Sequence, residues 1–242
     1  MRLPVVRGLI ERRILINYRA DPDVLARLLT PPFRPKLVRG FGVAGICLIR
    51  LADLRPRALP AVVGRASENA AHRIAVEWEE GGVRREGVYI PRRDTSSHFN
   101  TFSGGRLFPG LHHHARFDVT EEGDTYRVRM ESDDGAARVA VEARIRERLP
   151  ATSVFASLGE ASAFFQRGAL GYSPSARPGE LDALELHTLA WSMEPLELLC
   201  VESSFFGDTR LFPEGAVELD SGFLMRRIAH EWYARPRLRT AS

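Results

Sequence analysis

The sequence contains a single lysine, Lys36, although lysine and arginine together number 34. It contains 2 cysteines, Cys47 and Cys200, and both lie inside apolar runs. This placement predicts two buried thiols and argues against a disulfide framework. No hydrophobic run is long enough to cross a bilayer, because charged residues interrupt each one. Met1 to Pro4 does not begin an apolar signal sequence. We therefore expect a cytoplasmic protein with no membrane partner.

Long runs of positive charge are also absent, although the formal net charge is +3. Arginines alternate with acidic residues, as in the segment 142–148, which is typical of a solvated surface laced with ion pairs. No basic stripe interleaved with aromatic residues occurs, and no nucleic-acid-binding motif is present. These features predict no nucleic-acid partner.

No repeat or low-complexity linker divides the 242 residues. With 44% hydrophobic residues, the chain is long enough to bury one large core. We expect a single domain over residues 1–234, followed by a flexible tail at 235–242 that is rich in arginine and proline.

Two short helices are indicated by their capping residues. Asp21 is a suitable N-cap before Pro22, and Ser157 forms a capping-box pattern with Glu160, ending at Gly168. The remaining apolar patterns predict strands, and residues 133–135 have the sequence of a hairpin turn. The expected strands are 12–18, 42–51, 72–78, 87–90, 112–119, 126–131, 138–145, most of 184–200, and 217–228. The predicted fold class is therefore mainly β (α+β), an antiparallel sheet or β-barrel with a few short flanking helices.

The segment Glu86 to Arg93 has the sequence EGVYIPRR. Together with Tyr18 to Asp21 and Val38 to Ile49, in the same order along the chain, it resembles acetoacetate decarboxylase. In that enzyme a Tyr-Pro-Lys-Lys run supplies the amine that forms a Schiff base with the substrate. Here both lysine positions are arginine, and a guanidinium does not condense with a ketone.

Over nearly all its length the chain is identified as a member of the YqjF-like family of uncharacterised proteins, in the acetoacetate-decarboxylase-like superfamily. This resemblance implies a closed antiparallel barrel around a mostly apolar cavity, in a superfamily that acts on oxo acids. Oligomers are common in the related enzymes, so a homo-oligomer is an alternative to a monomer. The segments that carry the resemblance are 31–35, 44–47, 67–73, 89–94 and 230–231.

The resemblance also implies site residues. Arg92 matches the Schiff-base lysine and Arg93 the second lysine, while the active-site arginine of the family falls within about a residue of Arg12. Neighbours on a strand point to opposite faces, so we expect Arg92 to face the cavity and hold the carboxylate of a small organic acid. Arg93, Arg12, Asn69 and Tyr89 complete the predicted ligand-binding set. The active-site glutamate of the family has no aligned position. Lys36 is expected to be solvated.

Three functional alternatives stay open. Besides a binding protein without turnover, the chain is consistent with a lysine-independent lyase, isomerase or hydrolase that acts on an oxo acid. In that case Glu68 and His72 are the acid–base candidates, although polar residues in a loop before a strand are the simpler interpretation. The third alternative is a structural relic, with Arg92 paired internally to Asp94, Glu68 or Glu86.

The run His112-His113-His114 raises the question of a metal, because alternate histidines on a strand share one face. The sequence fixes no third ligand, although His72, His98 and Glu131 are candidates. We therefore predict no metal site and no cofactor, and leave the histidine run as an alternative.

Overall fold

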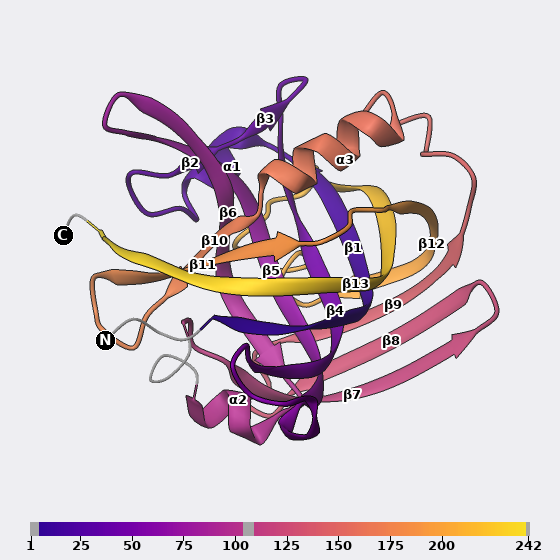
Figure 1. The fold of residues 1–242 in the computed structure, drawn as a ribbon. Coiled ribbons are helices and arrows are strands. Elements are labelled where there is room, and N and C mark those ends of the chain that lie inside the picture. The colour runs from indigo at the N-terminus through magenta and orange to yellow at the C-terminus, as the bar shows by residue number, and fades with distance from the viewer. Residues whose placement is uncertain (1–4, 104–108, 241–242) are drawn as a thin grey trace.

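The computed structural model describes residues 5–103 and 109–240 of the chain (Figure 1). Its hydrogen-bonded strands form one large sheet, and three α-helices lie among the described residues. The strands are β1 (Val6–Ala20), β2 (Arg34–Pro35), β3 (Leu37–Val38), β4 (Phe41–Pro56), β5 (Arg65–Glu80), β6 (Val83–Thr95), β7 (His113–Glu122), β8 (Thr125–Ser132), β9 (Arg138–Ile145), β10 (Leu170–Pro174), β11 (Glu180–Thr188), β12 (Glu194–Ser203) and β13 (Val217–Arg239). The helices are α1 (Pro22–Ala26), α2 (His98–Ser103) and α3 (Leu158–Arg167), with a 3-10 turn at Ala61–Val63.

The sheet closes on itself twice. One ring runs through β13, β1, β4, β5, β6, β10 and β11, and the β11–β13 pairing completes it. A second ring leaves β6 through β7, β8, β9 and β12 and returns to β13. The two rings share β1, β4 and β5, along with β6 and β13. The prediction of a mainly β fold with short helices is confirmed, but the sheet is mixed, because β6 pairs in parallel with both β10 and β7.

Each face of the shared strands packs against its own apolar core. Alternate residues such as Ile46 and Leu48 join one cluster, while Cys47 and Ile49 join the other, because successive side chains of a strand point to opposite faces. The second cluster also receives aromatic side chains from α3, drawn near the top of Figure 1. A residue's position in the alternation therefore decides which core it meets.

The local capping and turn signals of the sequence match the structure. The Asp21 side chain accepts hydrogen bonds from the first turn of α1, and Ser157 Oγ accepts one from the Glu160 backbone N–H at 3.1 Å. Gly135, with a φ of 69°, lies in the turn between β8 and β9. Two expectations differ. Helix α2 was not predicted, and residues 67–71, expected to form a loop ahead of the strand at 72–78, are already part of β5.

The expected flexible tail at 235–242 is instead strand as far as Arg239. This end of β13 pairs with β11, and its arginines find carboxylates there: Arg237 Nε donates to Asp182 at 2.6 Å, and Arg235 pairs with Glu185. These contacts explain why a polar segment stays ordered. None of the described helices is long and apolar enough to span a bilayer.

Candidate functional site

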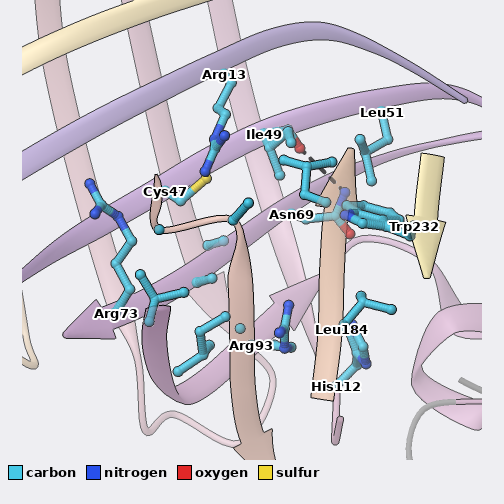
Figure 2. Close-up of a pocket in the computed structure, with 18 of the residues that line it drawn as sticks. Arg13, Cys47, Ile49, Leu51, Asn69, Arg73, Arg93, His112, Leu184 and Trp232 are labelled. Atoms are coloured by element: carbon cyan, nitrogen blue, oxygen red, sulfur yellow. Dashed lines mark hydrogen bonds between the residues drawn. The ribbon is translucent and has the colours of Figure 1, made fainter. Parts of the chain in front are cut away.

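A cavity of about 450 Å³ lies inside the ring of β13, β1, β4, β5, β6, β10 and β11 (Figure 2). Much of its wall is apolar, with Ile49 and Leu51 from β4, Leu184 from β11 and Trp232 from β13. Aromatic rings of α3 contribute as well. A cavity of this size suits a small organic molecule.

Arg93 extends into this cavity from β6 (Figure 2). Its Nε donates a long hydrogen bond of 3.4 Å to Ser173 Oγ, and no carboxylate of the described residues lies within ion-pair distance. Burial lowers the pKa of the Arg93 guanidinium to about 10, so it still carries its charge at neutral pH. Among the described residues Arg93 forms no ion pair, and the charge of Asp182 acts on it from beyond ion-pair distance.

Arg73 reaches the same cavity from β5 and is only 4% exposed. Its Nη2 donates to Asn17 Oδ1, while its Nε has no hydrogen-bond partner among the described residues. The guanidinium lies over the Phe165 ring, 4.9 Å from the centroid. Burial lowers the pKa of Arg73 to about 10. No described carboxylate pairs with it.

Arg13 enters from β1, and its Nε donates to the thiol sulfur of Cys47 at 3.3 Å. As for Arg73 and Arg93, no ion pair joins it to any carboxylate in the described part of the chain. Three arginines from three strands thus line one cavity, and none of them forms an ion pair with a carboxylate of the described residues. Burying a charge costs several kcal/mol unless it is paired, so the arrangement favours an anionic ligand.

Arg92, the residue expected in the cavity, points to the opposite face of β6. Its Nη2 donates to Asp94 and to Asp134, both at 2.8 Å, and to Ser132 Oγ at 2.6 Å. Asp94 is 0% exposed, so this is a buried ion pair. The structure therefore differs from the expectation that Arg92 binds the ligand, and agrees with the internal pairing that was its alternative.

The other predicted residues divide in the same way. Glu68 accepts hydrogen bonds from Arg12 Nη2 at 2.5 Å and from Arg50 Nε at 2.6 Å, on the side away from the cavity. His72 is 0% exposed and packs against Phe205, with both ring nitrogens unpartnered among the described residues. Burial, with the charge of Arg92, lowers the pKa of His72 to about 4. The expected Glu68–His72 acid–base pair is therefore not formed at the cavity.

Tyr89 lies in the other core, where its ring centroid is 6.1 Å from that of Phe33. Asn69 does line the cavity, and its Nδ2 donates to the carbonyl of Ile49 at 3.3 Å. Of the predicted set, only Asn69 and Arg93 meet at the cavity. The physical reason is that successive side chains of a strand point to opposite faces, so an error of one residue in the alignment moves a side chain from the cavity to the other core. The register between β5 and β6 also shifts, between His72 and Ile74.

Three cavity-lining residues, Arg13, Arg73 and Lys36, are not among the predicted site residues. Arg13 is one residue from the position suggested by the resemblance, so alternation along β1 could have found it. Arg73 is the last residue of the segment 67–73 and lies in the predicted strand 72–78, but the sequence assigns it no place in the site. Lys36, expected to be solvated, lines the cavity with a side chain only 13% exposed. The one feature of the sequence that could have drawn attention to Lys36 is that it is the sole lysine.

The histidine run does not act as a unit. His112 lines the cavity, where burial, with the charge of Arg93, lowers its pKa to about 4. His113 and His114 pair instead with Asp134 and Asp133, at 3.2 Å and 2.7 Å. In the described ranges, no three metal-ligating side chains converge.

A family model described as DUF2071, an uncharacterized conserved protein, matches residues 10–218. The chain belongs to this family. The assignment agrees with the resemblance drawn from the sequence. No curated protein matches the chain.

Solved structures share the fold of this DUF2071 protein. An acetoacetate-decarboxylase-like enzyme from Sphingomonas wittichii RW1 aligns with a TM-score of 0.66 and 13% identity, over 100% of this chain and 95% of that one. Acetoacetate decarboxylase from Legionella pneumophila aligns with a TM-score of 0.62 and 14% identity, over 99% and 88%. The enduracididine biosynthesis enzyme MppR, complexed with pyruvate, gives 0.64 and 10%, over 100% and 91%. At such low identity the likeness establishes the fold alone.

Proposed function

We propose that this protein binds a small organic carboxylate of the oxo-acid class inside the cavity, with Arg93 as the main anion contact. The observation that carries the proposal is the set of three cavity-lining guanidiniums, on Arg13, Arg73 and Arg93, without a carboxylate partner in the described chain. A planar guanidinium can hold a carboxylate through two parallel hydrogen bonds. The apolar wall would take the carbon skeleton of the ligand.

The fold comparison supports the ligand class. A structural neighbour was solved with pyruvate, which is a 2-oxo acid, and others are acetoacetate decarboxylases by name. Carboxylate and carbonyl groups occur together in such molecules. In a cationic cavity with apolar walls, the arginines can bind the carboxylate of such a ligand and the walls can contact its hydrocarbon part.

Schiff-base chemistry from β6 is not part of this proposal, because Arg92 and Arg93 stand where the resemblance places two lysines. The acid–base alternative is not favoured either, since Glu68 and His72 lie outside the cavity. The relic alternative accounts for Arg92, but Arg93 has no ion-pair partner among the described residues. A cytoplasmic location and a homo-oligomer stay predictions from the sequence.

The test is titration calorimetry at pH 6 with pyruvate, acetoacetate and a neutral ketone, on the native chain, Arg93→Gln and Arg92→Gln. We expect Arg93→Gln to weaken carboxylate binding about 10- to 100-fold, because a hydrogen bond to a charged group contributes about 1.5–3 kcal/mol. Arg92→Gln should bind carboxylates within about twofold of the native affinity, because the Arg92 guanidinium already pairs with Asp94 and Asp134. No binding to any carboxylate, or equal affinity in Arg93→Gln, would overturn the proposal.

A further inference from the structure

The thiol of Cys47, on β4, lies among the arginines that line the cavity (Figure 2). Its sulfur accepts the hydrogen bond from Arg13 Nε at 3.3 Å. Across the sheet, Cys47 pairs with Ala71 of β5, and Ala71 pairs with Arg93 of β6. Directly paired residues of neighbouring strands point to the same face, and the strands lie about 4.8 Å apart. Along this row, only the small side chain of Ala71 lies between the thiol and Arg93.

Arg73 is the third guanidinium near this thiol. It is two residues from Ala71 on β5, and its buried Nε has no hydrogen-bond partner among the described residues. Burial lowers the pKa of both Arg73 and Arg93 to about 10, and a negative charge on Cys47 acts in the opposite direction on each. A buried donor without a partner is costly, so the Arg73 side chain favours a bound acceptor beside the thiol.

The cavity reaches the surface of the molecule beside α2. Arg65 of β5 and Phe99 of α2 line it, and both side chains are exposed. The Arg65 guanidinium lies over the Phe99 ring, 5.6 Å from the centroid. A cation is therefore present where a ligand would enter. Because a cleft lined by charge of one sign raises the local concentration of the opposite ion about 10- to 1,000-fold, small anions should reach Cys47 in preference to neutral molecules.

Cys200 provides a comparison within the same chain. The sequence predicts that both thiols are buried, but Cys200 is exposed on β12, where the pairing with β9 shifts its register. Cys200 is paired there with Glu142. One thiol thus lies beside a carboxylate residue and the other beside guanidiniums. A charged reagent should distinguish the two.

We propose that Cys47 is a nucleophile that adds to the double bond of a small α,β-unsaturated dicarboxylate, such as maleate, held by the cavity arginines. The inference rests on the anion site of the proposed function, but it concerns a different reacting group and a different class of ligand. A dicarboxylate is favoured because three guanidiniums carry more charge than one carboxylate neutralises. Neighbouring cations also favour the thiolate, which is the attacking form of a cysteine.

The addition balances without a further reactant. The sulfur forms a bond to one alkene carbon, the π electrons move to the other carbon, and a proton adds there. That proton replaces the one that the thiol loses, so no oxidant or reductant is consumed. The guanidiniums would stabilise the negative charge that develops on the conjugated carboxylate.

The first experiment compares alkylation of the two thiols by iodoacetate, which is an anion, and by iodoacetamide, its neutral analogue, at pH 7 with peptide mapping. We expect the iodoacetate-to-iodoacetamide rate ratio to be at least about tenfold higher at Cys47 than at Cys200. Arg13→Gln should lower the ratio at Cys47 about threefold or more, whereas Arg13→Lys, which keeps the charge, should stay within about twofold. Equal ratios at Cys47 and Cys200 in the native chain would contradict the proposal.

Incubation with maleate tests the addition itself, by intact mass and peptide mapping. We expect one adduct on the Cys47 peptide, forming at least about tenfold faster than an adduct at Cys200, and no adduct at position 47 in Cys47→Ser. Succinate, the saturated analogue, should slow the reaction at Cys47 by competing for the arginines. The inference is wrong if maleate leaves Cys47 unmodified, or if it adds to Cys200 first.

Calorimetry with pyruvate separates this inference from the proposed function. If pyruvate binds but Cys47 reacts with neither iodoacetate nor maleate, the inference about the thiol is wrong and the anion site remains supported. If pyruvate does not bind but maleate adds selectively to Cys47, the inference is supported and the oxo-acid ligand class is wrong. If pyruvate does not bind and the two thiols react alike, both proposals are wrong.

Discussion

Arg92 and Arg93 are adjacent in β6, yet they have opposite electrostatic situations. The Arg92 guanidinium is held by Asp94 and Asp134, both at 2.8 Å, whereas Arg93 faces the cavity with one long hydrogen bond, to Ser173. Arg92 is part of an internal ion pair, whereas Arg93 forms no ion pair among the described residues.

Arg92→Gln should destabilise the protein by about 3–5 kcal/mol, because Asp94 would keep a buried charge without its counter-ion. Denaturant unfolding followed by fluorescence measures this change. Asp134→Asn removes the exposed partner of the same arginine and should cost about 1 kcal/mol or less. Equal effects of the two substitutions would contradict the assignment of Asp94 as the structural partner.

Adjacent alanines on β5 provide a test of which face holds the ligand. Ala71 pairs with Cys47 on one side and Arg93 on the other, and we expect Ala71→Leu to fill the cavity and weaken pyruvate binding at least tenfold. The free energy of unfolding of Ala71→Leu should differ from that of the native chain by about 1 kcal/mol or less. Ala70 also borders the cavity, but it is 1% exposed and packs in the opposite core, so Ala70→Leu should destabilise the fold by about 1–3 kcal/mol through overpacking. The reverse pattern would place the ligand on the other face.

His72 should make the protein less stable in acid. Burial holds its pKa at about 4, against about 6.5 in the unfolded chain, so the fold favours the neutral ring. Its contribution is therefore fully present above pH 6.5 and is lost as the pH falls toward 4. Between pH 7 and pH 4 the free energy of unfolding should fall by about 2–3 kcal/mol less in His72→Leu than in the native chain. Urea unfolding at these two pH values gives the measurement, and an unchanged loss would contradict it.

An amine placed at position 93 should become reactive, whereas one at position 92 should not. In a Lys36→Arg background, Arg93→Lys puts an amine inside the cavity, while Arg92→Lys puts it beside Asp94. We expect borohydride to trap a pyruvate adduct at position 93 at least tenfold more than at position 92. Comparable trapping at both positions would mean that cavity enclosure does not control the reactivity.

Much of the fold follows from local signals. The N-caps Asp21 and Ser157, the turn glycine at position 135 and the apolar strand of residues 42–51 all lie where the sequence predicts them. Such features depend on residues close together in the chain, so a single sequence is enough to find them. The segment Glu86 to Arg93 likewise indicated the superfamily fold.

The sequence by itself determined that arginines stand at positions 92 and 93, where the resemblance implies two lysines, and that the chain contains only one lysine. Only the tertiary structure decided that Arg93 and not Arg92 meets the cavity, because both faces of β6 are covered and alternation alone does not say which core each face meets. It also decided that Lys36 is enclosed, since a hydrogen bond to Ala75, distant in sequence, holds its segment against β5. Long-range pairing of this kind leaves no trace in a short window of residues.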